Sequence, residues 1–165
     1  MFVPADSGIE LWHALIEAGS AEDLVPVGLA ARDTLRLEAG MPLYGNELTL
    51  ETTPYDVGSA RLVKPKAGGF VGGDALATAA DEPHAQLVGL HVDGRRPART
   101  GYDVRVDDQS IGEVTSGAPS PTLERNIAMA RVDRSLTPGD TVEIDVRGKP
   151  TPATVVELPF YRREQ

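Results

Sequence analysis

The sequence predicts an α+β protein in which a mostly helical first part precedes a small antiparallel β-barrel. Two observations support this fold class. Segments of helical spacing are confined to the chain before about residue 80, and after about residue 84 short apolar runs alternate with turn residues. Short strands at that spacing are typical of a small barrel or sandwich. We therefore predict two domains, residues 1–82 and residues 83–165.

The first helix is predicted to begin at Ser7. Ser7 and Glu10 have the spacing of a capping box, in which the Ser hydroxyl accepts from the Glu backbone N–H and the carboxylate reaches back. Trp12 and Ile16 then fall on one apolar face, and Gly19 supplies a stop. We expect Trp12 to lie in a core and not to form a platform for a ligand.

The rest of the first domain alternates between short elements and irregular backbone. We predict a strand, a helix closed by Gly40, a turn, a glycine-rich loop and a helical turn, at residues 24–28, 30–39, 44–47, 68–73 and 74–79 respectively. The glycine-rich loop lacks the Gly-Lys-Ser/Thr ending of a phosphate-binding loop. We interpret it as a turn.

The second domain carries the pattern of short antiparallel strands. We predict strands at residues 86–92, 102–106, 113–116, 126–132, 141–146 and 151–158. Turn residues separate them at Asp93-Gly94, Asp107-Asp108, Pro138-Gly139 and Arg147-Gly148.

Composition excludes several classes of function. The net charge of −9, from 25 acidic and 16 basic residues, would repel a phosphate backbone, so we expect no nucleic-acid partner. The absence of cysteine excludes disulfides and thiolate chemistry and fits a reducing compartment. We see neither a signal peptide nor the roughly 18 consecutive apolar residues that span a bilayer, and therefore expect a cytoplasmic protein without membrane contact.

The histidines and two serines give no strong catalytic pattern. His13, His84 and His91 lack metal-ligand spacing, so no metal site is predicted. Ser116 and Ser120 do not lie in the Gly-x-Ser-x-Gly elbow of a hydrolase, and a serine nucleophile needs a base within hydrogen-bond reach. A structural role for both serines is favoured.

Arginines are the more informative residues. Arg32 opens a helix in an alanine-rich context, where a cation opposes the positive end of the helix dipole. It could bind an anion or carboxylate, or it could have a structural partner in Asp33 or Glu38. Arg99 ends a basic cluster at residues 95–99, and Arg162-Arg163 form another. Arginine holds carboxylates with two parallel hydrogen bonds, although a solvated basic face is the alternative.

Several segments together resemble the T-proteins of the glycine cleavage system. The most specific is Gly-Leu-Ala-Ala-Arg-Asp-Thr-Leu-Arg-Leu-Glu-Ala-Gly-Met-Pro-Leu-Tyr-Gly-Asn-Glu-Leu at residues 28–48. It is joined by Thr53-Pro54, by Gly-Phe-Val-Gly at 69–72, by residues 112–123 and 126–130, and by Leu-Pro-Phe-Tyr at 158–161. The resemblance is collinear across nearly the whole chain. Dimethylglycine- and sarcosine-oxidising enzymes and a sulfonium demethylase share parts of the pattern.

The resemblance implies a fold, a reaction and three binding residues. The fold would be part of the T-protein's middle domain followed by its C-terminal barrel. The reaction would be aminomethyl transfer from the lipoyl arm of the H-protein to tetrahydrofolate, which gives methylenetetrahydrofolate and ammonia. Arg32 is similar to the family's substrate-binding arginine, Tyr161 to a C-terminal aromatic near the folate, and Arg99 to an arginine where folate or H-protein contact is expected.

The resemblance also implies that part of the family's site has no counterpart in these residues. A T-protein is about twice as long, and its N-terminal half carries the aspartate linked to catalysis and a glutamate that helps to bind the pterin. We thus assign no catalytic residue and expect the isolated chain to be inactive. Its apolar first domain would meet the other half or pair as a homodimer. The alternative is a non-catalytic folate-binding or interaction module, or part of a related folate-dependent demethylase.

Overall fold

The computed structural model describes residues 2–64, 66, 68–81, 85–133 and 135–162. The chain divides into two compact units, Met1–Asp33 and Thr34–Gln165. Residues 82–84, where the sequence predicts the domain boundary, lie outside the described residues, so the boundary between 1–82 and 83–165 stays a prediction. Across the described chain, every helix is too short or too polar to cross a bilayer.

The N-terminal unit is built around helix α1 (Gly8–Gly19), flanked by 3-10 turns η1 (Ala5–Ser7) and η2 (Ser20–Glu22). Helix α1 begins directly after Ser7 and ends at Gly19, as predicted. The capping hydrogen bond is not formed, because Ser7 ends a 3-10 turn with φ −91° and ψ 0° and does not take the extended conformation of a capping residue.

Two expectations for this unit are wrong. Trp12 is 52% exposed and every described residue of α1 is at least partly exposed, so Trp12 does not lie in a core here. Residues 24–28 form no strand. A strand needs a neighbouring ladder for its backbone groups, and these residues are exposed to solvent.

Helix α2 (Leu29–Glu38) confirms the second predicted helix and its glycine stop. Gly40 takes a left-handed conformation with φ 64°, which glycine adopts without steric cost. Its N–H donates to the Leu37 carbonyl at 2.9 Å, and the N–H of Met41 donates to the Arg36 carbonyl at 2.8 Å. These two bonds form a Schellman motif, which turns the chain sharply at the end of α2.

The segment that follows α2 is irregular, as predicted. The amides of Asn46, Glu47 and Leu48 all donate to the Leu43 carbonyl and close the predicted turn. Two short helical elements follow, η3 (Ala60–Leu62) and α3 (Gly73–Ala79).

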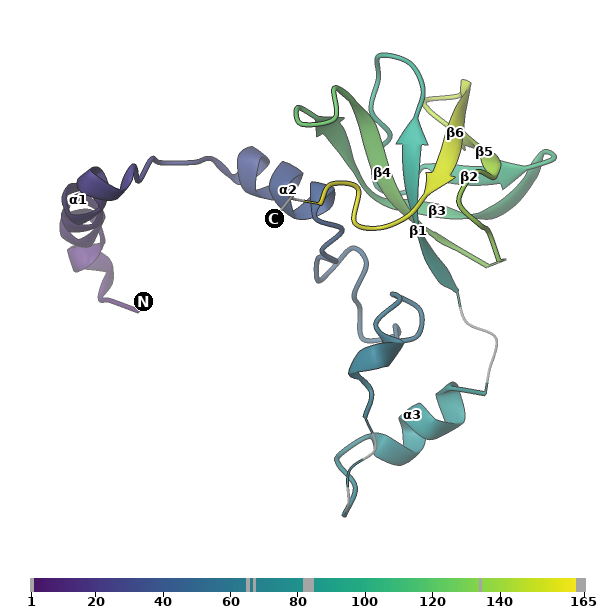
Figure 1. The fold of residues 1–165 in the computed structure, drawn as a ribbon, viewed down its shortest axis with the longest axis horizontal. Helices are drawn as coiled ribbons and strands as arrows, with labels where there is room; N and C mark the ends of the chain where they lie inside the picture. The colour runs from purple at the N-terminus through teal and green to yellow at the C-terminus, as the bar shows by residue number, and fades with distance from the viewer. Residues whose placement is uncertain (1, 65, 67, 82–84, 134, 163–165) are drawn as a thin grey trace. The chain divides into compact units, whose positions relative to one another are not determined.

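The second half forms a closed antiparallel barrel with the strand order β1-β4-β3-β2-β5-β6 (Figure 1). The strands are β1 (Gln86–Val92), β2 (Asp103–Val106), β3 (Gln109–Ser120), β4 (Arg125–Val132), β5 (Thr141–Asp145) and β6 (Pro150–Val156). The predicted α+β class and barrel are confirmed. The turn residues Asp107, Asp108 and Arg147 adopt positive φ, as tight hairpin turns require.

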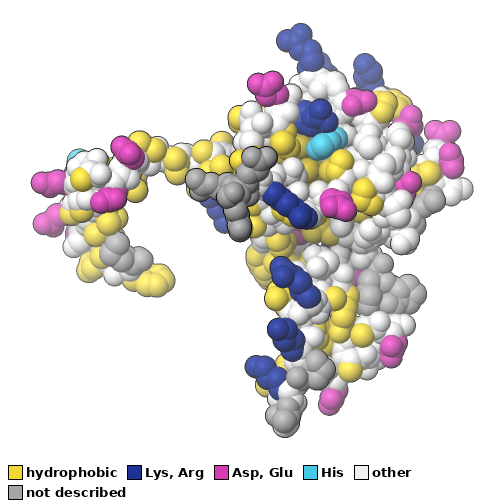
Figure 2. Space-filling model, viewed as in Figure 1, with side chains coloured by type: hydrophobic (Ala, Val, Ile, Leu, Met, Phe, Trp, Pro, Cys, Tyr) yellow, Lys and Arg dark blue, Asp and Glu magenta, His cyan; other side chains and the backbone are white. Residues whose placement is uncertain are grey.

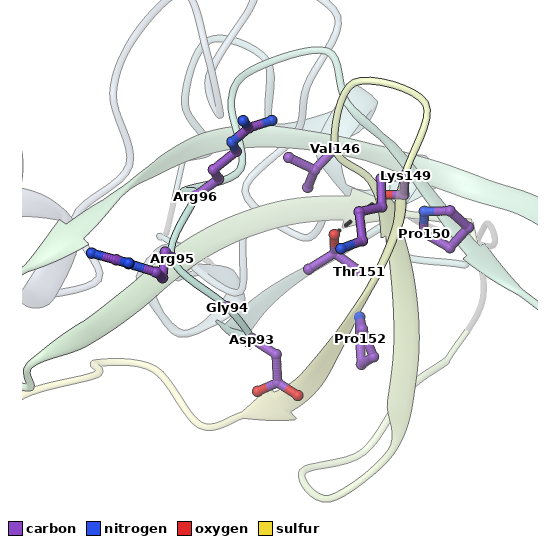
Figure 3. Close-up of a pocket in the computed structure, with 9 residues that line it drawn as sticks. All are labelled: Asp93, Gly94, Arg95, Arg96, Val146, Lys149, Pro150, Thr151 and Pro152. Carbon is purple, nitrogen blue, oxygen red and sulfur yellow. Dashed lines mark hydrogen bonds between the residues drawn. The ribbon is translucent and has the colours of Figure 1, made fainter.

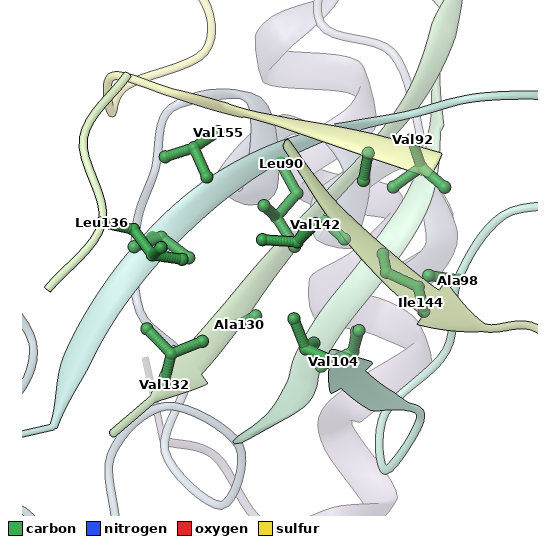
Figure 4. Packing of buried hydrophobic residues seen from close by; sticks show 14 of the residues in the cluster. Leu90, Val92, Ala98, Val104, Ala130, Val132, Leu136, Val142, Ile144 and Val155 are labelled. Atoms are coloured by element: carbon green, nitrogen blue, oxygen red, sulfur yellow. The ribbon is translucent and has the colours of Figure 1, made fainter. Parts of the chain in front are cut away.

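Two clusters of buried apolar residues hold this unit together. The first fills the barrel and includes Leu90, Val104, Val132, Val142 and Ile144 (Figure 4). The second consists of Leu37 from α2 with Ala118, Ile127 and Met129 from β3 and β4, and partly buried Leu158 and Phe160 pack against it. The second cluster therefore joins the end of α2 and the C-terminal segment to one side of the barrel.

Candidate functional site

Arg32 is exposed near the start of α2, where the sequence predicts a ligand-binding arginine. Its backbone N–H donates to the Gly28 carbonyl at 3.2 Å, which fixes it in the helix. Within the described residues no hydrogen bond or ion pair holds its guanidinium. Glu38, one of its two suggested structural partners, is bound by other groups. The guanidinium is thus available to a carboxylate.

Arg99 lies in the loop between β1 and β2 and is exposed. Its Nη1 donates to the carbonyl of Gly117 on β3 at 3.3 Å. Thr100 anchors the same loop, because its hydroxyl donates to the Thr115 carbonyl at 2.8 Å. A guanidinium carries five N–H donors, so one bond to the backbone orients the group and leaves others for a ligand.

The remaining basic residues of this loop line a separate groove. Its volume is about 530 Å³, and it is lined by Asp93, Gly94, Arg95, Arg96, Val146, Lys149, Pro150, Thr151 and Pro152 (Figure 3). The side chains of Arg95 and Arg96 point in different directions (Figure 3). Basic and acidic side chains are interspersed over the visible surface (Figure 2). The guanidinium groups of Arg95 and Arg96 therefore do not converge on one point in the groove.

Tyr161 lies in the C-terminal segment, residues 157–162, which we call the C-terminal strap. Its backbone N–H donates to the Glu38 carbonyl at 2.9 Å, and the residue is 45% exposed. Phe160 and Leu158, by contrast, pack on the second cluster. The strap is thus fixed through its backbone and apolar residues, and the Tyr161 ring remains accessible. Arg162 is exposed, and Arg163 lies outside the described residues.

Glu38, the residue that binds the backbone of the strap, has a buried carboxylate. Glu38 is 3% exposed, and its Oε1 accepts from the Ser120 hydroxyl and from the Thr122 N–H at 3.3 Å. Its Oε2 accepts from the Thr122 hydroxyl at 2.8 Å. A buried charge is costly unless hydrogen bonds replace its lost water. Three donors from the β3–β4 hairpin satisfy Glu38 and hold the end of α2 on the barrel.

A second buried charge lies two residues earlier. Arg36 donates from Nη1 to Glu47 Oε2 at 3.1 Å and from Nη2 to the Ser116 hydroxyl at 2.8 Å. Glu47 Oε2 also accepts from the Leu43 N–H at 2.9 Å, and the Asn46 amide donates to the Thr115 carbonyl at 3.0 Å. This network attaches the loop after α2 to β3. The sequence analysis does not predict this network. Its only signal in the sequence is the pair of charged residues, Arg36 and Glu38, on either side of Leu37 at the end of α2.

The serines have the structural role that the sequence favours. Ser116 binds Arg36 and Asn46, and Ser120 binds Glu38 and the Leu123 N–H. No imidazole is among the partners of either hydroxyl in the part of the chain that the structure describes. Among the described residues, neither Ser116 nor Ser120 is activated by a histidine.

The two histidines that the structure describes, His13 and His91, lie in different environments. His13 is exposed on α1, and His84 lies outside the described residues. His91 accepts from Arg125 Nη1 at 3.0 Å through its Nδ1. Burial of the ring and then the positive charge of Arg125 lower the pKa of His91 from its ordinary value. Over the described ranges, no three His, Cys, Asp or Glu side chains cluster as metal ligands.

The three predicted binding residues are divided between the compact units. Arg99 and Tyr161 belong to Thr34–Gln165, and Arg32 belongs to Met1–Asp33. Within the described part of the larger unit, Arg99 and Tyr161 are connected to β3 through different hydrogen bonds. Arg99 bonds Gly117, and Tyr161 bonds Glu38, which in turn bonds Ser120.

Comparisons with known families match both parts of the chain. Residues 86–162 match the glycine cleavage T-protein C-terminal barrel domain, which agrees with the closed barrel of the structure. Residues 1–67 match the GCVT N-terminal domain. Both family models describe domains of T-proteins of the glycine cleavage system. The chain belongs to the glycine cleavage T-protein family.

Curated relatives and a solved structure agree with this assignment. An aminomethyltransferase of Streptomyces avermitilis is 55% identical over 172 residues, covering 100% of this chain and 46% of that protein. One from Saccharopolyspora erythraea is 54% identical, covering 97% and 44%. The crystal structure of glycine cleavage system aminomethyltransferase T from Bartonella henselae matches with a TM-score of 0.83 and 36% identity, covering 96% and 45%. The chain spans about half the length of the curated relatives it matches.

Proposed function

We propose that the chain is part of an aminomethyltransferase of the glycine cleavage system. The observation that carries this proposal is the identity of 55% over the whole chain to a protein named aminomethyltransferase. The exposed guanidinium of Arg32 adds support, since it is available to a ligand carboxylate. The reaction transfers the aminomethyl group from the lipoyl arm of the H-protein to tetrahydrofolate and releases ammonia.

Arg32, Arg99 and Tyr161 are the residues that would bind tetrahydrofolate. All three residues are accessible to a ligand, because Arg32 and Arg99 are exposed cations and Tyr161 is 45% exposed. Arginine can hold the carboxylates of the glutamyl part, and an aromatic ring can stack on a planar heterocycle. Tetrahydrofolate supplies the acceptor for the one-carbon unit, and these side chains supply orientation and charge.

The apolar residues of the N-terminal unit would form a docking face for the rest of a complete T-protein. The unit exposes Trp12, Leu15, Leu24, Val25, Val27 and Leu29. Apolar side chains show at its surface in the space-filling view (Figure 2). Exposed apolar surface of this kind marks an interaction site, and the matched relatives are about twice as long as the chain. A second copy of this chain is the competing occupant.

The basic groove would contact the lipoylated H-protein. Arg95, Arg96 and Lys149 line it, and Asp93 is its one acidic residue. Dispersed positive charge on a chain of net charge −9 speeds and orients the approach of an acidic surface. Arg95→Ala and Arg96→Ala should weaken binding of the H-protein, and the difference from the unaltered chain should shrink at high salt.

We place the reaction in the cytoplasm.

Reconstitution tests the proposed reaction. The chain would be mixed with the part of the Streptomyces avermitilis enzyme that it does not match, and ammonia release from aminomethylated H-protein would be measured with and without tetrahydrofolate. We expect tetrahydrofolate-dependent release that falls at least about tenfold in Arg32→Ala, since charged hydrogen bonds contribute about 1.5–3 kcal/mol. Arg61→Ala removes the same charge from an exposed position outside the proposed site and serves as the control.

Two outcomes would contradict the proposal in different ways. A correctly folded mixture without transfer, but with tetrahydrofolate binding, would favour a non-catalytic folate-binding module. Transfer that depends on a methylated donor in place of the aminomethylated H-protein would assign the chain to a related demethylase.

A further inference from the structure

The last turn of α2 docks on β3 in a defined register. Three consecutive residues of the helix meet three alternate residues of the strand, in the pairs Arg36 with Ser116, Leu37 with Ala118, and Glu38 with Ser120. The outer pairs are hydrogen-bonded, and the middle pair shares the second apolar cluster. Sliding α2 along β3 would leave a buried charge without a partner, so the register is fixed by electrostatics.

A β-bulge in β3 makes this register available. Val114 points into the barrel core, so an unbroken strand would also point Ser116 inward. The register of β3 against β4 shifts between Val114 and Ser116, which inserts Thr115 as an extra residue. The Thr115 hydroxyl donates to the Met129 carbonyl at 3.1 Å. The bulge reverses which alternate residues of β3 face away from the barrel core. Ser116, Ala118 and Ser120 therefore face α2.

Glu38 connects this register to the C-terminal strap. Its side chain is held by Ser120 and Thr122, and its carbonyl accepts the backbone N–H of Tyr161 at 2.9 Å. Gly40 makes room for the strap, because a Cβ there would lie 3.1 Å from the Pro159 Cα. The strap therefore follows the end of α2 closely wherever Glu38 is held.

The strap also packs, through its apolar side chains, on the second cluster and on β1. Phe160 and Leu158 pack on the second cluster, and Phe160 stacks on His91 with ring centroids 6.1 Å apart. A Cβ on Gly89 would lie 2.9 Å from Leu158 and 3.1 Å from Phe160, so the strap rests directly on β1. The apolar contacts fix the strap laterally, and the Glu38 carbonyl fixes the backbone at Tyr161 itself.

We propose that Ser120 and Thr122, acting through Glu38, are positioning residues for Tyr161. The proposal rests on the proposed function, in which the Tyr161 ring contacts tetrahydrofolate. The two hydroxyls hold the Glu38 carboxylate, the carboxylate holds the last turn of α2, and its carbonyl holds the Tyr161 backbone. Neither hydroxyl touches the ligand. They determine where the exposed ring is presented.

Hydrogen exchange of the strap tests the mechanical part of the proposal on the chain alone. Thr122→Val removes the hydroxyl and keeps the shape at an exposed position, so folding is retained, and Thr122→Ser keeps the hydroxyl. We expect Thr122→Val and Ser120→Ala to raise exchange at Tyr161 severalfold, and Thr122→Ser to match the unaltered chain. Ser110→Ala is the matched control, since Ser110 also donates to a carboxylate, that of Asp103, from the far end of β3. Unchanged exchange in both Thr122→Val and Ser120→Ala would overturn the proposal.

A double-mutant cycle in tetrahydrofolate affinity tests the positioning role. In the reconstituted enzyme we expect Ser120→Ala and Thr122→Val each to weaken binding by about three- to tenfold, which corresponds to about 0.7–1.4 kcal/mol. In a Tyr161→Ala background both should have almost no further effect, because the ring they position is gone. A merely stabilising role would give additive losses, and additivity would overturn the positioning role.

Two results of the tetrahydrofolate-binding experiment separate the proposed function from the positioning role of Ser120 and Thr122. If the reconstituted protein binds no tetrahydrofolate with Arg32, Ser120 and Tyr161 all intact, the proposed function fails and the positioning of Tyr161 for that ligand fails with it. If binding requires Arg32 but is insensitive to Ser120→Ala and Thr122→Val, the function stands and the positioning role is overturned.

Discussion

The imidazole of His91 stacks on the ring of Phe160, with centroids 6.1 Å apart and ring planes inclined by 24°. On the same imidazole, Nδ1 accepts a hydrogen bond from Arg125 Nη1 at 3.0 Å. Arginine is only a donor, so Nδ1 carries no proton in this arrangement. A neutral histidine therefore joins β1 to the C-terminal strap.

This arrangement predicts that stability falls on acidification. The pKa of His91 is lowered in the folded chain, first by burial and then by Arg125, so the unfolded chain binds more protons just below the ordinary value of 6.5. The contribution of His91 is complete above pH 6.5 and is lost as the pH falls through the lower folded pKa. Urea unfolding between about pH 7.5 and about pH 5 should show a steeper loss of stability in the unaltered chain than in His91→Gln. His13→Gln, at an exposed position on α1, is the control, and equal slopes in all three proteins would contradict the prediction.

Leu37 should contribute far more to stability than its neighbour Leu35. Leu37 is 0% exposed in the second cluster, whereas Leu35 is 61% exposed two residues earlier on the same helix. Leu37→Ala should lower the free energy of unfolding by about 2–5 kcal/mol through lost burial and a residual cavity. Leu35→Ala removes the same atoms and should change it by less than about 0.5 kcal/mol. Urea midpoints at constant slope measure both, and equal losses would show that α2 does not dock through Leu37.

The buried pair of Arg36 and Glu47 should be strongly coupled. The two side chains are 8% and 0% exposed and 3.1 Å apart. Removing either partner leaves the other charge buried, so Arg36→Ala and Glu47→Ala should each cost about 3–5 kcal/mol. The double variant should cost clearly less than the sum of the two. Chemical denaturation of all four proteins gives the coupling energy, and simple additivity would show that the pair does not act as a unit.

Gly117 should tolerate no side chain. A Cβ there would overlap the carbonyl oxygen of Ala98, a backbone atom that no rotamer change can move. Gly117→Ala should lower the free energy of unfolding by about 1–3 kcal/mol and displace the adjoining loop that carries Arg99. Gly28→Ala, where nothing lies within 4 Å of the added Cβ, is the control. Nuclear magnetic resonance shifts at Thr100 and Tyr102 report on the loop, and unchanged shifts would contradict the expected displacement.

The barrel could be predicted from the sequence because its signals are local. Alternating apolar residues and paired turn residues reproduce β1 at Gln86–Val92 without error. Strand β3 is longer than the predicted 113–116. The sequence pattern does not indicate its continuation beyond Ser116, because Gly117 and Pro119 resemble strand breakers. In the fold Gly117 allows the Ala98 backbone to approach, and Pro119 pairs only with β4, where its missing N–H is tolerated.

The candidate site was less accessible to sequence reasoning. Arg36 and Glu38 look like a solvated helix face, and their burial depends on partners about 80 residues away on β3. Periodicity predicts the apolar face of α1 but does not specify what covers it, and Trp12, for which a core position is predicted, is exposed. Charge and context draw attention to Arg32 and Arg99, the family resemblance alone indicates Tyr161, and the binding roles of all three stay predictions.

Trp12 offers a direct report on the proposed docking face. It is the only tryptophan of the chain, and it is 52% exposed on α1. The isolated chain should therefore emit at the long wavelength of a hydrated indole, and acrylamide should quench it efficiently. Adding the unmatched part of the Streptomyces avermitilis relative should shift emission to shorter wavelength and reduce quenching, because burial removes water from the ring. Trp12→Phe removes the signal and keeps an apolar ring, so association measured by sedimentation should persist. A shift that depends on the concentration of this chain alone would instead assign the face to a second copy.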